Sequence, residues 1–358
     1  MKLYSKKTGI LDSPLHYGKT PRWLFEKMVE LARAMIEVIV LDFGRKEFIK
    51  RISDPLWFQA FGCLLGFDWH SSGLTTTVCG AIKQALLPTK KDIKLFACGG
   101  KGSTSRKTPL EIVEIGESIG IKESIIEKIK YASKMAAKVD SSLVQDGYVL
   151  YHHVIFFTNE GEWAVIQQGM NTSNRYARRY HWLSENVKEF VVEPHTAICC
   201  NKRGKTLNLV DKTIDNTRQV ITHLSREHPA KTVKEIIKLP VEHSISLRGI
   251  RRIEKTLLKT YENPPKDFTD LIGIEGVGAQ TIRALSLVAH LCYGTALSWK
   301  DPALYSFAHG GKDGTPYPID RKTYINTIET LKTILAEARI GLFDKKRAFE
   351  RLQHSFPL

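Results

Sequence analysis

The first apolar pattern of the chain has helical spacing. Over residues 20–52 one face collects Leu24, Phe25, Met28, Leu31, Ala32, Met35 and Ile39. Pro21 falls in a first turn, a position that proline favours. This pattern predicts a long helix packed on a core. A further helix is expected at about 74–87, followed over 93–120 by a short strand, a glycine-rich basic loop and a helix. Helical periodicity then continues to about residue 139.

The middle of the chain has the pattern of strands. GYVLYHHVIFFTNEGEWAVIQQGM (147–170) contains two β-branched and aromatic runs separated by TNEGE, a sequence typical of a hairpin turn. From about residue 212 the pattern is helical again and is interrupted by prolines. We therefore predict a mainly helical α+β fold with two domains. Residues 1–210 form an α+β domain with a small antiparallel sheet, and residues 211–358 form an all-helical domain.

Composition adds an expectation about the partner. Lys and Arg number 53 and Asp and Glu 38, which gives a formal charge of +15 over 358 residues. Such a balance favours a polyanionic partner such as DNA, although a basic surface without a specific partner is the alternative. No secretory signal pattern and no apolar run of membrane-spanning length occur, so a cytoplasmic protein without a membrane partner is expected. The six cysteines include no C-x-x-C pair, and we expect no metal and no cofactor.

The stretch LIGIEGVGAQTIRAL (271–285) is typical of two short helices joined by a tight turn. Gly276 and Gly278 flank Val277 in that turn, and glycine permits positive φ and close approach. The amides at the start of the following helix, near Gln280 and Thr281, can hold a DNA phosphate without reading a base. We interpret the stretch as a DNA-binding helix-hairpin-helix, with a plain turn between helices as the alternative.

This stretch resembles the helix-hairpin-helix of the endonuclease III-like DNA glycosylases. In that family a lysine nucleophile stands two places after the second glycine, where this chain has Gln280. The family's aspartate finds its nearest match in Asp320, after an insertion that contains HGGKDG and Lys312. An abasic-site lyase needs an amine and a group that moves protons. Lys312 and Asp320 supply these types, and a solvated surface turn is the alternative for HGGKDG.

Three other segments carry candidate residues. The glycine-rich CGGKGSTSRKTPLE (98–111) precedes a helix with Thr108 as its expected N-cap, which suits an anion site, and an ordinary flexible loop is the alternative. FDWHSSG pairs two groups able to transfer protons, although a buried, hydrogen-bonded histidine is the favoured alternative. QQGMNTSNRYARRYHW (167–182) interleaves amides, guanidinium groups and rings that can contact nucleic acid or, alternatively, fill a core. The candidates are Lys101, Arg106 and Lys107 in the first segment, Asp68 and His70 in the second, and Gln167, Gln168, Asn171, Arg175, Arg178 and Arg179 in the third.

Taken together, FGCLLGFDWHSSG, ACGGKGSTSRKTP, QQGMN with ARRYHW, and SFAHGGKDGTPYPIDR resemble the archaeal and bacterial family called domain of unknown function 763. The resemblance implies a DNA-repair-like protein with possible abasic-site lyase activity on damaged or distorted duplex. The amine is Lys312 first and Lys101 or Lys107 next, with Asp320 or Asp68 transferring protons. Two alternatives stay open. One is a binding protein without catalysis that recognises DNA structure, and the other is a metal-dependent nuclease that uses Asp68 and His70.

Overall fold

The first four helices form a bundle at one end of the molecule. The computed structural model describes residues 20–67, 72–88, 90–173, 175–200, 204–303 and 321–355. The bundle contains α1 (Arg22–Phe43), α2 (Arg45–Ser53), α3 (Pro55–Leu65) and α4 (Gly73–Leu86). The predicted long helix is two helices, because Gly44 has a φ of 83° and turns the chain between them. Asp54 caps α3 by accepting hydrogen bonds from the amides of Leu56 and Trp57.

A five-stranded antiparallel sheet occupies the centre of the molecule. Its strands are β1 (Leu95–Lys101), β3 (Val149–Thr158), β4 (Trp163–Asn171), β5 (Tyr176–Leu183) and β6 (Ala197–Cys199), in the order β1-β3-β4-β5-β6. Two short strands, β2 (Val144–Gln145) and β7 (Leu207–Asn208), pair separately. The predicted hairpin is therefore β3 and β4, joined by a turn at residues 159–162. A mainly helical α+β fold with a small antiparallel sheet is confirmed.

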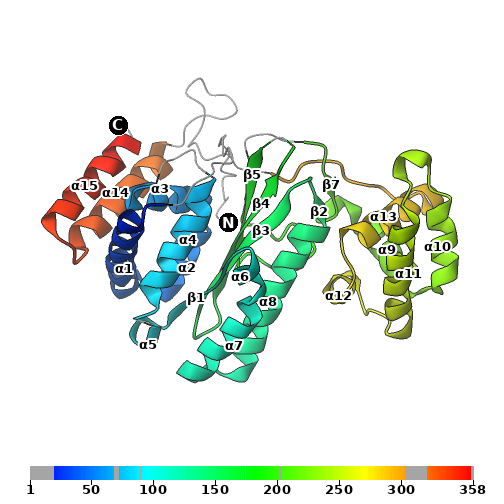
Figure 1. Ribbon diagram of the computed structural model, residues 1–358, viewed down its shortest axis with the longest axis horizontal. Coiled ribbons are helices and arrows are strands. Elements are labelled where there is room, and N and C mark those ends of the chain that lie inside the picture. The colour runs from blue at the N-terminus through cyan, green and yellow to red at the C-terminus, as the bar shows by residue number, and fades with distance from the viewer. Residues whose placement is uncertain are drawn as a thin grey trace.

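Helices cover both faces of the sheet (Figure 1). Along β1, Leu95 and Ala97 pack with the bundle, whereas Phe96 and Cys98 pack on the opposite side. This alternation follows from the two-residue period of a strand. The helices after the bundle are α5 (Lys90–Ile93), α6 (Ser103–Arg106), α7 (Thr108–Ile119) and α8 (Glu123–Ser142), and α8 lies on the sheet face opposite the bundle. The sheet thus separates two hydrophobic cores.

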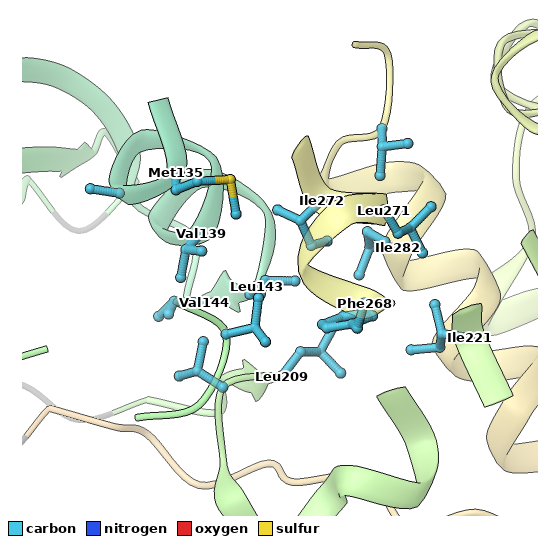
Figure 2. Close-up of a cluster of buried hydrophobic side chains, with 14 of the residues drawn as sticks. Met135, Val139, Leu143, Val144, Leu209, Ile221, Phe268, Leu271, Ile272 and Ile282 are labelled. Carbon is cyan, nitrogen blue, oxygen red and sulfur yellow. The ribbon is translucent and has the colours of Figure 1, made fainter. Parts of the chain in front are cut away.

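A helical module follows at the far end from the bundle (Figure 1). It contains η1 (Lys212–Ile214), α9 (Asp215–Arg226), α10 (Pro229–Ile237), η2 (Val241–His243), α11 (Leu247–Glu262), α12 (Phe268–Gly273) and α13 (Ala279–Tyr293). Figure 2 shows Met135, Val139 and Leu143 of the α8 region facing Leu271 and Ile272 of α12. These side chains belong to one continuous core, which fixes the module against α8.

The last two helices return to the bundle. α14 (Arg321–Glu337) and α15 (Leu342–Ser355) bury Leu331, Ile334 and Ala348 in the same core as α1 and α3. The Arg351 Nε donates to the Leu64 carbonyl at 2.9 Å. The division of the chain into two domains at residue 210 stays a prediction. That division assigns residues 321–355 to the helical domain, whereas in the structure they pack on the N-terminal helices. Within the described residues, no helix combines the length and apolar content needed to cross a membrane.

Candidate nucleic-acid interface

The turn between α12 and α13 is tight and partly open to solvent. Gly276 is exposed with a φ of +96°, a conformation that favours glycine, and Val277 beside it is buried. The Val277 amide donates to the Ile274 carbonyl at 3.3 Å. Gly278 directly precedes α13. A Cβ added at Gly278 would have no heavy atom within 4 Å, so the space beside this residue is open. The first amides of α13 therefore start a helix whose N-terminal end has no side-chain cap.

A lysine from α8 holds this turn from the other side. The Lys138 Nζ donates to the Ile274 carbonyl at 3.0 Å and to the Val277 carbonyl at 2.7 Å. Burial lowers the pKa of Lys138, the charge of Lys134 lowers it further, and Glu275 acts in the opposite direction. The Gln145 amide donates to the Ala279 carbonyl at 3.0 Å. The sheet-covering helix α8 and the strand after it thus set the position of the turn.

Helix α11 borders the same turn and is strongly basic. Thr256 contacts the Gly276 carbonyl. Gly249 lies against the Gln280 side chain, because a Cβ added at Gly249 would be 2.6 Å from the Gln280 Nε2. Arg252 lies between these two positions on the same helix face, and it is exposed. We call the exposed residues Gly276, Gln280 and Arg252, together with the half-buried Lys138, the hairpin surface. It combines an open turn with positive charge.

Thr281 and Val277 are exceptions among the predicted hairpin contacts. Thr281 is 4 % exposed and Val277 is 1 % exposed, so both side chains belong to the core and only their backbone faces the turn. Gln280, where the glycosylases have their lysine, is exposed at the start of α13. The turn geometry thus suits contacts made by backbone groups.

The glycine-rich basic segment, predicted as a loop, covers the end of β1, the short helix α6 and the start of α7. Gly99 has a φ of +105°, and a Cβ there would stand 2.2 Å from the His153 carbonyl oxygen, so only glycine fits. Lys101, Arg106 and Lys107 are exposed. The predicted N-cap is wrong: Thr108 lies inside α7, which starts without a side-chain cap bond, and its hydroxyl donates to the Ser105 carbonyl. Glu111 instead accepts from the Gly99 amide at 2.7 Å and from the Lys83 ammonium.

The QQ and RR pairs of the third segment are inside the fold. Gln167, Gln168, Arg178 and Arg179 are each at most 4 % exposed, because neighbouring residues of β4 and β5 point into opposite helical layers. Gln167 donates to Asp140 of α8, and Gln168 donates to the Ser72 carbonyl. The Arg179 guanidinium donates to Gln59 and Thr75 of the bundle. These placements fit the alternative in which the motif fills a core, and they remove the four side chains from direct contact with DNA.

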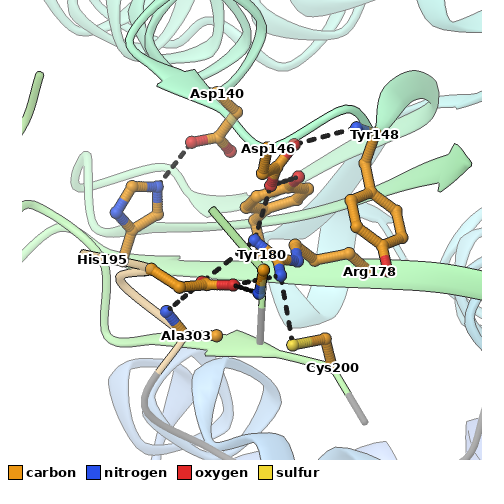
Figure 3. A network of polar contacts seen from close by, with 10 residues as sticks. Asp140, Asp146, Tyr148, Arg178, Tyr180, His195, Cys200 and Ala303 are labelled. Carbon is orange, nitrogen blue, oxygen red and sulfur yellow. Dashed lines mark hydrogen bonds and ion pairs between the residues drawn. The ribbon is translucent and has the colours of Figure 1, made fainter. Parts of the chain in front are cut away.

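A buried ionic cluster surrounds Arg178 (Figure 3). Its guanidinium donates to Asp146 at 2.8 Å and to both carboxylate oxygens of Asp301, at 3.1 and 2.8 Å. Burial is the largest single influence on Arg178 and lowers its pKa, but the surrounding acidic groups, Asp146 first, together outweigh it and hold the pKa of Arg178 well above its usual value. Asp301 also accepts from the Gly204 and Ala303 amides. The cluster therefore fastens the chain after α13 to the sheet.

A second buried carboxylate, that of Asp140, accepts hydrogen bonds from three side chains. Asp140 is 1 % exposed and accepts from Gln167, from the Trp182 ring nitrogen at 3.0 Å and from His195. His153 of β3 is hydrogen-bonded to Ser133 of α8 and to Gln167 of the neighbouring strand β4. Sequence patterns did not point to Asp140, Asp146, Asp301 or Lys138, because each gains its role from a partner far along the chain.

Two of the remaining candidates, Asn171 and Arg175, are described by the structure, and Asn171 is half-buried. Asn171 and Arg175 lie at the turn between β4 and β5, where Arg175 is exposed with a φ of 61° and Asn171 accepts from the Ser173 amide. Lys312, Asp320, Asp68 and His70 lie outside the described residues. Over the part of the chain that the structure describes, no three His, Cys, Asp or Glu side chains gather in a way that could hold a metal ion.

The fold and the hairpin surface define a mainly helical α+β protein in which Lys138 of α8 and Arg252 of α11 border the turn between α12 and α13. The chain belongs to the family described as "Protein of unknown function (DUF763)", whose model matches residues 9–319. No curated protein and no solved structure matches it. The family assignment agrees with the resemblance seen in the sequence.

Proposed function

We propose that this protein binds DNA through the hairpin surface and acts in DNA repair. The observation that carries the proposal is the open turn at Gly276–Gly278, which leads into an uncapped helix start beside the ammonium of Lys138. Backbone amides at a helix start and a nearby cation bind a phosphate diester regardless of sequence. The formal charge of +15 supports a polyanionic ligand.

The reaction that we propose is cleavage at abasic sites through a lysine Schiff base. The amine attacks C1′ of the opened sugar, water leaves, and an imine forms. Removal of a proton from C2′ then expels the 3′ phosphate, and water hydrolyses the imine to release the lysine. Lys312 is the first candidate amine. Lys101 and Lys107 follow, because both are exposed, Lys101 at the end of β1 and Lys107 between α6 and α7.

Borohydride trapping tests this reaction directly. The protein is incubated with an oligonucleotide duplex that carries one abasic site, in the presence of EDTA, and the imine is reduced to a stable covalent adduct. We expect an adduct with the wild type that one of Lys312→Ala, Lys101→Ala and Lys107→Ala abolishes. Lys130→Ala is the matched control, because Lys130 is a surface lysine whose ammonium pairs with Glu127 at 2.6 Å.

The alternatives give different results in the same assay. A protein that binds DNA without catalysis shifts the duplex in a salt-sensitive way and forms no adduct. A metal-dependent nuclease cuts the duplex only when EDTA is replaced by a divalent cation. Either result refutes the lyase, and absence of any DNA binding refutes the hairpin proposal as well.

A further inference from the structure

The ammonium of Lys138 is bound by main-chain carbonyl groups, which is an unusual environment for a lysine. It is half-buried, and its ammonium is held by the main-chain carbonyls of Ile274 and Val277 rather than by a carboxylate. Among the described residues no Asp or Glu oxygen lies within 4.0 Å of its nitrogen. Two neutral acceptors bind the ammonium without cancelling its charge. A positive charge is therefore fixed at the turn.

A like charge stands one helical turn away. Lys134 is exposed on the same helix and opposes the protonation of Lys138, and Glu275 at the turn offsets this only in part. Like charges four residues apart on a helix destabilise it. An anion that approaches both ammonium groups relieves this repulsion.

The geometry leaves one donor of Lys138 available. A lysine ammonium has three N–H groups, and the two carbonyls accept two of them. Both carbonyls belong to the turn that contains the exposed Gly276, so the ammonium lies beside that turn. A phosphate oxygen is the acceptor that suits this charged donor.

We propose that Lys138 is a DNA-backbone contact of the hairpin surface, in which its ammonium binds the turn carbonyls and one DNA phosphate at the same time. The inference rests on the proposed DNA binding and names the residue of α8 that takes part in it. The covering helix of the sheet and the helix-hairpin-helix then engage DNA as one unit, because the same nitrogen joins all three.

The test compares the salt dependence of binding to a duplex in the wild type, Lys138→Met and Lys138→Arg. One phosphate contact contributes a slope of about 0.9 in the logarithm of the binding constant against the logarithm of salt concentration, which is about eightfold in affinity at about 0.1 M salt. We expect Lys138→Met to lose this slope and this affinity. Lys138→Arg keeps the positive charge and is expected to keep the slope.

Two controls separate a DNA contact from a purely structural role. Lys130→Met removes one charge from the same helix at a site paired with Glu127 and is expected to change neither quantity. Thermal unfolding shows whether each variant is folded. Unchanged affinity and an unchanged slope for Lys138→Met overturn the inference. Weaker binding by both Lys138 variants at an unchanged slope also overturns it, because that result indicates only a displaced turn. A wild type that does not bind DNA refutes the proposed function itself.

Discussion

His152 predicts a specific loss of stability in acid. Its side chain is 2 % exposed on β3, in register with Lys101 and Gln168, and neither ring nitrogen has a hydrogen-bond partner among the described residues. Burial lowers its pKa from 6.5 to about 3, with smaller contributions from His153 and Lys101. The folded protein therefore keeps this imidazole neutral.

The magnitude follows from proton linkage. Below pH 6.5 the unfolded chain takes up a proton at His152, whereas the folded chain does so only near pH 3. The unfolded state then binds more protons, so the free energy of unfolding falls as the pH falls. Between about pH 7.5 and about pH 5 the loss due to this one group is about 2 kcal/mol.

The perturbation is His152→Leu, and the assay is urea unfolding at both pH values. Leucine has no polar atom to leave unpaired, so the variant is expected to stay within about 1 kcal/mol of the wild type at the higher pH. At the lower pH it is expected to lose about 2 kcal/mol less than the wild type. His153 and His181 also have lowered pKa values, but both proteins contain them and their contribution cancels in the comparison.

A surface histidine provides the control. His223 is 66 % exposed at its side chain, and His223→Gln is expected to leave the pH dependence as in the wild type. If wild type and His152→Leu lose the same free energy of unfolding between the two pH values, the reasoning from burial is wrong.

Two further substitutions test the cluster and the turn. Asp301→Asn removes a charged partner from Arg178, which is 1 % exposed. In urea titration it is expected to lower the free energy of unfolding by about 3 kcal/mol. Asp215→Asn at an exposed site is the control and is expected to cost less than about 1 kcal/mol. An equal effect of both would contradict the buried-cluster argument. Gly276→Ala forces an alanine to a φ of +96°, which costs about 1–2 kcal/mol and is expected to weaken DNA binding in a gel-shift titration. Gly278→Ala is the tolerated control, since its φ is −144° and the site is open, and equal weakening by both would count against strain at the turn.

Local patterns predicted the elements of the fold well. The hairpin of β3 and β4 follows from alternating apolar runs around TNEGE, and the paired glycines around Val277 do mark a turn between two helices. Both signals are contained within about twenty residues. Short-range rules of backbone conformation are sufficient for such segments.

The partners of buried polar groups could not be predicted in this way. Arg178 and Arg179 are adjacent in sequence, yet they point into different layers and bond Asp301 and Gln59, each more than a hundred residues away. Whether such an arginine meets DNA or a carboxylate depends on which helix covers each sheet face. The same holds for Lys138, whose carbonyl acceptors lie in a turn 136 and 139 residues further along.

The return of α14 and α15 to the first helices has a consequence for the order of folding during synthesis. The core shared by Met28, Phe58, Leu331 and Ala348 needs segments from both ends of the described chain. Translation of the roughly 260 residues between α4 and the middle of α15 takes about 13 to 50 s at roughly 5–20 residues per second. During that interval the nascent bundle presents an apolar face that α14 and α15 will cover, which makes it a target for chaperones that bind exposed hydrophobic surface on the ribosome.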